Sequence, residues 1–330
     1  MIVTFTANPS VDRTAVLPSA LRRGAVNRLR EVHDGPGGKG VNVARALHLA
    51  GAPTLAVLPA PAGHPITEAL TLAGVDHLSV PVVHRVRTNL TLAEPDGTTT
   101  KINEPGALLD PAAREGLREA LVAAARGAAW VALCGSLPPG PGSDWYADLV
   151  TALRPTGARI AVDTSDAPLT ALGAALDRAA PDLLKPNAFE LAQLAEADRH
   201  TAARIDGTAL EEAAAAGDFG PAVRAATGLV DRGVTYVLAT LGAAGAVLVS
   251  DRGAWAATPP PIVPASTVGA GDSALAGFLL AHTRGADPED CLRTAVAYGA
   301  GATALPGTTV PRPDQTDPDA AVVRALDALP

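Results

Sequence analysis

Cysteine is scarce in this sequence: only Cys134 and Cys291 occur among 330 residues, and they do not form a pair with metal-ligand spacing. This scarcity excludes a disulfide framework and a cysteine-based zinc centre. Both cysteines lie in apolar or helical contexts. We therefore expect buried thiols in a reducing compartment.

The sequence also lacks a long hydrophobic run and an excess of positive charge. No window is long enough to span a bilayer, and the first residues, MIVTFTANPS, have no basic region of the kind that begins a signal peptide. The net charge is −8, with acidic and basic residues interspersed, which does not favour a polyanion-binding surface. We expect a soluble, cytoplasmic protein with no membrane and no nucleic acid among its partners.

What the sequence does contain is an alternation of short apolar runs with Ala/Leu-rich helical segments. This alternation predicts an α/β fold with a mainly parallel sheet flanked by helices. Ligands of such sheets bind beyond the carboxyl ends of the strands. The expected strands are 2–7, 54–60, 130–134, 159–163, 182–185, 236–241 and 246–250, and the expected helices include 41–50, 111–126, 145–153, 189–196 and 221–231.

Two stretches interrupt the alternation. Residues 13–35 carry no helical period, and residues 88–103 have the pattern of a hairpin that turns at Asp96-Gly97. Both would fit a small β-sheet separate from the main core, either as a lid or as an ordinary edge hairpin. Residues 197–220 predict a surface helix with loops, and the Pro/Asp-rich run 311–318 is expected to lead to a short terminal helix.

A glycine-rich loop, DGPGGKGVNVARAL at 34–47, precedes a helical pattern. Its spacing resembles a dinucleotide-binding loop, but the preceding stretch is charged rather than apolar, and no acidic residue ends the next strand. A phosphate-binding P-loop needs Ser or Thr after its lysine, whereas Gly40 follows Lys39. Close approach to a ligand and a tight turn without a ligand both remain open.

The segment STVGAGDSALAGFLL, residues 266–280, places Gly269, Ala270 and Gly271 at the start of a helix, with Asp272 in the first turn. Unpaired amides and the helix dipole favour an anion there. If a phosphoryl group lay on these amides, Asp272 could accept a proton from an attacking hydroxyl. Alternatively, Asp272 only stabilises the start of the helix.

Three further segments carry polar groups at predicted strand ends. In LLKPNAFEL, Asn187 and Glu190 form a helix-capping pair that could also hold a magnesium hydration shell. Carboxylate and amide groups suit sugar hydroxyls, and basic side chains suit a sugar phosphate. The residues concerned are Asp12, Asn42, Asn89, Arg87 and Lys39; a further contact to a nucleotide could come from Thr240 or Gly242 in the turn between 236–241 and 246–250.

Together these segments resemble the ribokinase-like, or PfkB, carbohydrate kinases, in the branch that contains 1-phosphofructokinase, tagatose-6-phosphate kinase and the minor 6-phosphofructokinase. The resemblance runs in order through TANPSVD, GGKGVNVAR, RTNLTL, CGSLPPG, VDTS, LLKPNAFEL, TLGAAGAVL and STVGAGDS. It implies one ribokinase-like domain over residues 1–330, with a three-layer core and a β lid formed by about 13–35 and 86–104. It also implies a homodimer through that lid.

The resemblance implies a role for each matching residue of this sequence. Asp272 matches the catalytic base, and Gly269, Ala270 and Gly271 match the anion hole. The residues that match the family's sugar-phosphate contacts are Asp12, Gly38, Lys39, Asn42, Arg87 and Ser136. Those that match its nucleotide contacts are Lys185, Asn187, Thr240, Gly242 and Gly245. Asn187 and Glu190 match the pair that holds magnesium through water. The implied cofactors are ATP and Mg²⁺, with a monovalent cation as an open question.

The resemblance predicts a hexose-phosphate kinase that makes fructose 1,6-bisphosphate from fructose 1-phosphate. Lys39 in the glycine loop favours fructose 1-phosphate or tagatose 6-phosphate, whereas CGSLPPG favours fructose 6-phosphate. A non-catalytic sugar-phosphate sensor on the same fold is the alternative from a different class, and a dinucleotide-dependent oxidoreductase is a more distant one.

Overall fold

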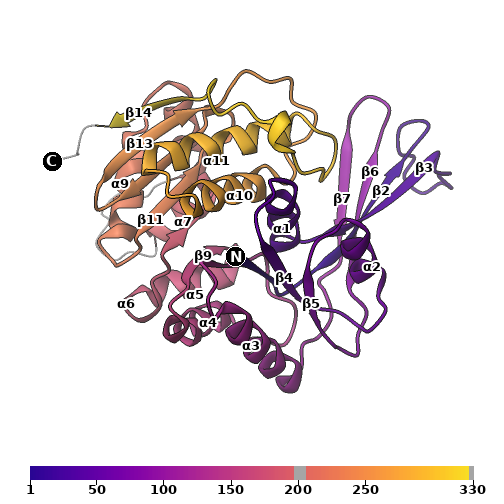
Figure 1. Ribbon diagram of the computed structural model, residues 1–330. Helices are drawn as coiled ribbons and strands as arrows, with labels where there is room; N and C mark the ends of the chain where they lie inside the picture. Colours follow the sequence, from indigo (N-terminus) through magenta and orange to yellow (C-terminus); the bar gives the residue numbers. More distant parts are fainter. Residues whose placement is uncertain (197–205, 327–330) are drawn as a thin grey trace.

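The computed structural model describes residues 1–196 and 206–326, in which a main sheet of ten strands has the order β14-β13-β12-β11-β10-β9-β8-β1-β4-β5 (Figure 1). The strands from β11 to β5 pair in parallel, while β12, β13 and β14 pair antiparallel. The predicted mainly parallel α/β fold is confirmed. The strands are β1 (Ile2–Thr6), β4 (Thr54–Pro59), β5 (His77–Val80), β8 (Trp130–Cys134), β9 (Arg159–Asp163), β10 (Leu183–Leu184), β11 (Tyr236–Thr240), β12 (Ala246–Ser250), β13 (Gly253–Thr258) and β14 (Val322–Leu326).

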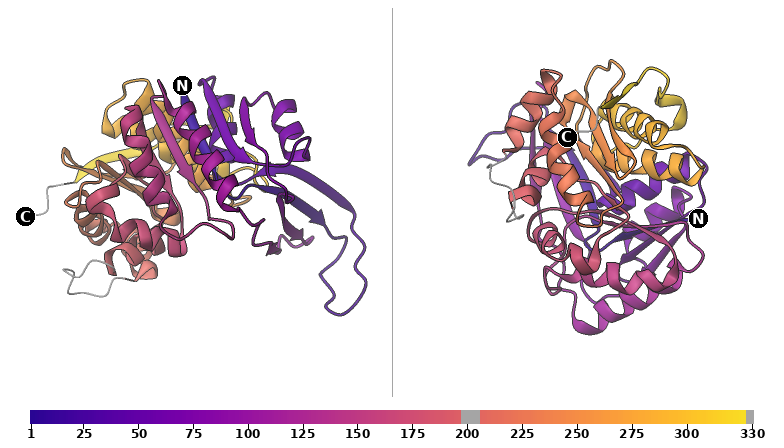
Figure 2. Two further views of the ribbon diagram at one scale, coloured as in Figure 1. Left: turned by 90° about the horizontal axis from the view of Figure 1, so that it is seen from below. Right: turned by 90° about the vertical axis from the view of Figure 1, so that its left-hand side faces the viewer.

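Helices cover both faces of the main sheet, so the core has three layers (Figures 1 and 2). One face carries α1 (Lys39–Leu49), α2 (Pro65–Leu72), α10 (Ala270–Thr283) and α11 (Pro288–Thr303). The other carries α3 (Pro111–Ala125), α4 (Trp145–Leu153), α5 (Asp166–Ala174), α6 (Leu176–Ala179), α7 (Ala188–Glu196), α8 (Gly207–Ala215) and α9 (Gly220–Val230).

The apolar sequence of the central strands follows from this burial on both faces. In β8, Val131 and Leu133 pack into one helical layer, while Trp130 and Cys134 pack into the other. Successive side chains of a strand point to opposite faces, so a strand covered on both sides must be apolar at every position. Cys134 and Cys291 are free thiols with 0% and 1% exposure, which confirms their predicted burial.

A second, small sheet of order β3-β2-β6-β7 projects from the edge of the main body (Figures 1 and 2). Its strands are β2 (Ser10–Val16), β3 (Glu31–Gly37), β6 (Arg87–Ala93) and β7 (Thr99–Asn103). The predicted hairpin is confirmed: β6 and β7 pair antiparallel across a turn in which Gly97 has φ 89°. Strands β2 and β6 pair in parallel.

The prediction of a short terminal helix is wrong for the residues that the structure describes. Residues Val322–Leu326 form β14, which pairs antiparallel with β13 and so forms one edge of the main sheet. Tertiary pairing with an open sheet edge overrides the weak helix preference of this Ala/Leu-containing segment. The predicted surface helix is present as α8, while 197–205 lie outside the described residues. No helix within 1–196 or 206–326 combines the length and apolarity needed to cross a membrane.

Candidate functional site

The carboxyl ends of five neighbouring parallel strands bring polar side chains to one edge of the main sheet. The strand order β11-β10-β9-β8-β1 sets the order in which these groups follow one another. Loops beyond such strand ends form the binding crevices of open parallel sheets. The groups are Thr240 on β11, Lys185 and Asn187 after β10, Asp163 on β9, Ser136 after β8, and Asn8 and Asp12 after β1.

Asp272 and Asn42, which are 230 residues apart in the chain, meet at this edge. Helix α1 packs beside α10, so the Asn42 amide donates a hydrogen bond of 2.9 Å to Asp272 Oδ2. Asp272 lies in the first turn of α10 and is 7% exposed, and Asn42 is 5% exposed. The structure therefore brings together the predicted base and a predicted sugar-binding residue.

The environment of Asp272 favours its protonated form. Burial, and next the negative charge of Asp163, raise the pKa of this carboxyl to about 6. The positive charges of Lys39 and Lys185, together with the Asn42 hydrogen bond, oppose this effect. A carboxylate with a pKa near neutrality is suited to accept a proton at physiological pH.

The start of α10 presents free backbone donors next to this carboxyl. Gly269 caps the helix in the left-handed conformation, with φ 79°, and the space beside its α-carbon is open. Among the described residues, the amides of Gly269 and Gly271 have no hydrogen-bond acceptor, whereas the Ala270 amide donates to the Thr267 carbonyl at 3.4 Å. Free amides at a helix N-terminus stabilise an anion.

Asp163 is a site residue that the sequence interpretation did not select. This carboxylate is 1% exposed at the end of β9, and it forms ion pairs with Lys39 Nζ at 2.7 Å and Lys185 Nζ at 3.2 Å. The two lysines hold the pKa of Asp163 low despite burial. Its position at the end of an apolar strand, in VDTS, was the available signal.

Lys39 is held by several negative charges at once. Burial alone would lower its pKa, but the carboxylates of Asp163, Glu190 and Asp272 raise it instead. Its side chain is still one-third exposed, at 33%, so part of it remains accessible from solvent. Lys185, by contrast, is 4% exposed, and its Nζ lies 3.2 Å from where a Cβ on Gly271 would sit.

Asn187 and Glu190 form the predicted capping arrangement at the start of α7. The Asn187 amide donates to Glu190 Oε2 at 2.8 Å, and the Glu190 amide donates to Asn187 Oδ1 at 2.9 Å. Burial and the charge of Asp163 raise the pKa of Glu190. Mg²⁺ in phosphoryl-transfer sites is commonly held by one or two carboxylates with water and phosphate oxygens, and this pair fits that donor set.

Asp12 lies at the junction of the two sheets. Its Oδ1 accepts hydrogen bonds from Ser10 Oγ at 2.7 Å and from Asn89 Nδ2 at 3.0 Å. A Cβ on Gly37 would come within 2.2 Å of the Asp12 carboxyl, and a Cβ on Gly38, which has φ 109°, would meet Thr6 at 2.7 Å. The glycine loop is therefore required for the close approach of α1 and β3 to the end of β1.

Several buried polar atoms of β6 and of the first turn of α10 have no partner among the described residues. They are Arg87 Nε, Asn89 Oδ1 and Ser273 Oγ. Arg87 Nη1 donates to the Glu104 carbonyl at 3.1 Å, and Ser136 Oγ accepts from Asn8 Nδ2 at 3.4 Å. Unpaired buried polar atoms are costly, which indicates that water or a polar ligand completes their hydrogen bonding.

The turn between β11 and β12 is confirmed as a tight connection. Thr240 pairs with Asn187 in an isolated bridge, which joins this turn to the start of α7. Gly245 has φ 109°, and a Cβ there would lie 1.9 Å from the Ala257 carbonyl oxygen. The backbone conformation and packing at this position therefore require glycine, whether or not a ligand binds there. Contacts of Thr240, Gly242 and Gly245 with a nucleotide stay predictions.

The sequence matches the pfkB family carbohydrate kinase over residues 6–315. The chain belongs to this family of carbohydrate kinases. Its members transfer a phosphoryl group to a carbohydrate, so this protein is a phosphotransferase.

Alignments with two relatives extend over nearly the whole chain. A 1-phosphofructokinase of Rhodobacter capsulatus is 36% identical over 318 residues, 95% of this chain and 94% of the relative. The ATP-dependent 6-phosphofructokinase isozyme 2 of Escherichia coli is 32% identical over 320 residues, 96% of each chain.

Solved structures show the same fold. The crystal structure of phosphofructokinase-2 from Escherichia coli in complex with substrates and products has a TM-score of 0.83 at 30% identity, and it covers 95% of this chain and 96% of its own. A ribokinase from Thermotoga maritima, at 17% identity and a TM-score of 0.72, shares the fold. The predicted ribokinase-like fold is thus confirmed.

Proposed function

We propose that this protein transfers the γ-phosphoryl group of ATP to fructose 1-phosphate and so forms fructose 1,6-bisphosphate and ADP. The observation that carries the proposal is the buried carboxyl of Asp272, with a pKa raised to about 6, beside the free amides that begin α10. Similarity to 1-phosphofructokinases of Rhodobacter capsulatus and Xanthomonas campestris, each 36% identical, supports this substrate.

In the proposed reaction Asp272 accepts the proton of the attacking sugar hydroxyl. As the hydroxyl oxygen bonds to the γ-phosphorus, the bond to the bridging oxygen of ADP breaks. The amides of Gly269, Ala270 and Gly271 stabilise the charge on the transferred group; Gly269 and Gly271 are free to do so, and Ala270 must release Thr267. Asn42 orients the Asp272 carboxylate through its 2.9 Å hydrogen bond.

The remaining predicted residues divide between the two substrates. Asn187 and Glu190 would hold Mg²⁺ through water, and the ion would neutralise charge on the phosphates. We assign sugar-phosphate contacts to Asp12, Gly38, Lys39, Asn42, Arg87 and Ser136, and nucleotide contacts to Lys185, Thr240, Gly242 and Gly245. The unpaired atoms of Arg87 and Asn89 support the position of the sugar phosphate at the junction of the sheets.

The small sheet is proposed as a lid over this site and as the interface of a homodimer. Exclusion of water would limit hydrolysis of ATP in place of transfer. Val26, Leu29, Val32 and Ile102, which lie in or beside this sheet, are large apolar side chains with at least 46% exposure, which supports an apolar interface. A sedimentation experiment that finds only monomers at working concentration would contradict the dimer. A cytoplasmic location stays part of this proposal.

The experiment that tests the substrate is ADP release from Mg-ATP with fructose 1-phosphate, fructose 6-phosphate and tagatose 6-phosphate, compared at sub-saturating concentration. Preference for fructose 1-phosphate is expected. Lys39→Met should raise KM for that substrate by ~10-fold or more through loss of a charge-assisted contact, whereas Lys101→Met, an exposed control on β7, should not. Equal KM in both variants would remove Lys39 from substrate binding.

Fructose 6-phosphate is the second candidate, because the Escherichia coli isozyme 2 is 32% identical over 96% of this chain. Preference for it would replace the proposed substrate while leaving the kinase chemistry in place. Absence of turnover with all three sugar phosphates, despite tight sugar-phosphate binding, would favour a sensor. Potassium dependence can be measured in the same assay, since the Escherichia coli enzyme has also been crystallised in complex with potassium.

A further inference from the structure

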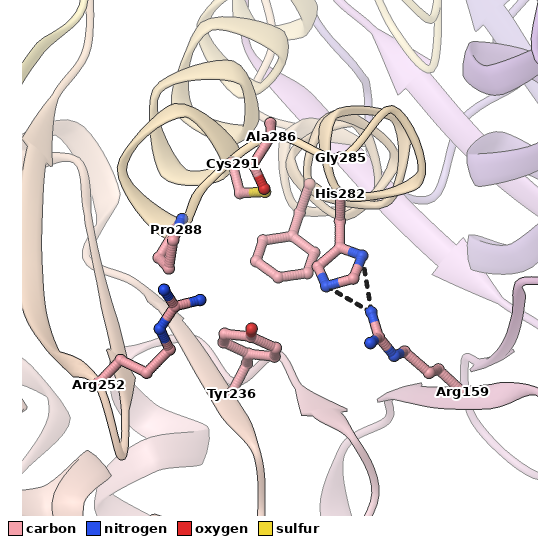
Figure 3. Close-up of a pocket in the computed structure, with 9 residues that line it drawn as sticks. Arg159, Tyr236, Arg252, His282, Gly285, Ala286, Pro288 and Cys291 are labelled. Atoms are coloured by element: carbon pink, nitrogen blue, oxygen red, sulfur yellow. Dashed lines mark hydrogen bonds between the residues drawn. The ribbon is translucent and has the colours of Figure 1, made fainter.

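A second pocket, which we call the basic pocket, lies at the opposite end of the main sheet from the strand ends described above. Its cavity volume is about 280 Å³. Arg159 and Tyr236 begin β9 and β11, Phe278 and His282 lie in the last turns of α10, and Arg252 lies in the β12–β13 turn (Figure 3). None of these residues belongs to the proposed catalytic machinery.

The lining of the basic pocket is positive although the chain as a whole is negative. Its nine residues include two arginines and a histidine but no carboxylate, whereas the full sequence carries a net charge of −8. A pocket with this lining attracts anions locally, even though the net negative charge of the whole protein repels them.

The two guanidinium groups are not neutralised within the described residues. Arg252 is exposed, and its guanidinium forms no hydrogen bond or ion pair with another described residue, while Figure 3 shows it aimed into the pocket between Pro288 and Tyr236. Arg159 Nη1 lies 2.7 Å from His282 Nε2 and 3.1 Å from Nδ1. Burial and the charge of Arg159 lower the pKa of His282, so its ring is a neutral partner that leaves the arginine charge in place.

Two acidic side chains near the basic pocket are engaged elsewhere. Asp182, whose charge reaches His282, accepts hydrogen bonds from the Ile160 amide at 2.8 Å and from Arg154 at 3.4 Å. Asp287 caps α11 through the amide of Asp290 at 2.9 Å. Neither residue lines the cavity, so neither supplies the missing anion.

We propose that the basic pocket binds a small phosphate monoester, with its phosphate between Arg159 and Arg252 and its carbon chain against Phe278 and Tyr236. Guanidinium groups form bidentate hydrogen bonds with phosphate oxygens. The buried ring of Phe278 and the half-buried ring of Tyr236 supply an apolar wall. A volume of about 280 Å³ lies at the lower limit of small-molecule sites, which favours a monoester of a few carbons over a nucleotide.

The basic pocket is joined to the strand-end site by continuous elements. Helix α10 runs from Asp272 to His282, a separation of about 15 Å at the rise of an α-helix. Strand β9 runs from Arg159 to Asp163 over about 13 Å. A monoester bound here would therefore contact the far ends of the same elements that carry the proposed base and its neighbouring carboxylate.

The test follows the imidazole resonances of His282 by NMR, assigned with a His282→Gln variant, during titration with glycerol 3-phosphate. This readout is local, so probe bound at the sugar-phosphate site does not mimic it. A saturable shift is expected with glycerol 3-phosphate but not with glycerol. Arg252→Gln should weaken binding by ~10-fold or more, which corresponds to at least about 1.4 kcal/mol, while kinase turnover stays unchanged.

Arg126→Gln is the matched control, because Arg126 is an exposed arginine at the end of α3 and its loss changes the net charge equally. It should bind the probe as the wild type does. A shift that grows linearly without saturation would overturn the proposal. Equal affinity in Arg252→Gln and wild type, or equal weakening in Arg126→Gln, would do so as well.

Discussion

Replacing Asp272 with asparagine should stabilise the folded protein and at the same time remove most of its turnover. Burial and Asp163 raise the pKa of this carboxyl from 3.8 to about 6. At 1.36 kcal/mol per pKa unit, that shift corresponds to about 3 kcal/mol. The charged carboxylate is the unfavourable form in the folded state, so the wild type loses stability as pH rises from 3.8 through about 6.

Asparagine has nearly the same shape and no charge to bury. Its side-chain oxygen can accept the hydrogen bond that Asn42 Nδ2 donates to Asp272 Oδ2 in the wild type. At about pH 8 the free energy of unfolding of Asp272→Asn should therefore exceed that of the wild type by up to about 3 kcal/mol. Below the ordinary aspartate pKa of 3.8 the two proteins should become equally stable, since both side chains are then neutral.

The assay is urea unfolding, followed by tryptophan fluorescence at several pH values, in parallel with kinase turnover. Loss of a general base typically lowers kcat by about 10²–10⁴, and the wild-type rate should fall below an apparent pKa of about 6. Asp177→Asn removes an exposed carboxylate and serves as the control. A stability difference that does not depend on pH would refute the burial argument, and near-normal turnover would remove Asp272 from the mechanism.

Three other substitutions test separate parts of the structure. Asp163→Asn removes the carboxylate that forms ion pairs with the buried Lys185 and with Lys39, so the free energy of unfolding near pH 7 should fall by about 3–5 kcal/mol. This loss should shrink on acidification, because the pKa of Asp163 lies below 3.8. Glu190→Gln should keep the helix cap but raise the Mg²⁺ concentration for half-maximal turnover by ~10-fold. An unchanged Mg²⁺ concentration for half-maximal turnover would exclude Glu190 from magnesium binding. Gly245→Ala places a β-carbon on a residue with φ 109° and against the Ala257 carbonyl oxygen, so denaturant unfolding should show a large decrease in the free energy of unfolding. Gly217→Ala is the control, because Gly217 has φ 85° but open space around it, and a decrease of only about 1–2 kcal/mol is expected there. Equal losses would contradict the clash.

The fold could be predicted from the sequence where local pattern and tertiary environment agree. The segment 130–134 is apolar at every position because β8 is covered on both faces, and 88–103 alternates around a turn with Gly97. The terminal segment behaved differently, because pairing of β14 with β13 depends on a sheet edge that local sequence does not contain. Strand β10 has only two residues, and Pro186, which has no amide proton to donate to a neighbouring strand, follows shortly after it.

The candidate site could be predicted only in its separate parts. Gly269 and Asp272 have a local signature, as do Asn187 and Glu190, whose capping hydrogen bonds lie within four residues. The link between Asn42 and Asp272 spans 230 residues and arises from the packing of α1 beside α10. Asp163 was missed for the same reason: its two lysines come from distant parts of the chain, and only the fold brings them together.

The pairing of β2 with β6 has a consequence for how the protein folds. Between these two strands the chain forms β3, α1, β4, α2 and β5, so completing the small sheet closes a long loop that contains two strands of the main sheet. Contacts between distant segments close long loops and slow folding. We expect amide protons of β6 to gain exchange protection later during refolding than those of β1 and β4, and a fragment that ends before Arg87 to leave β2 paired only with β3.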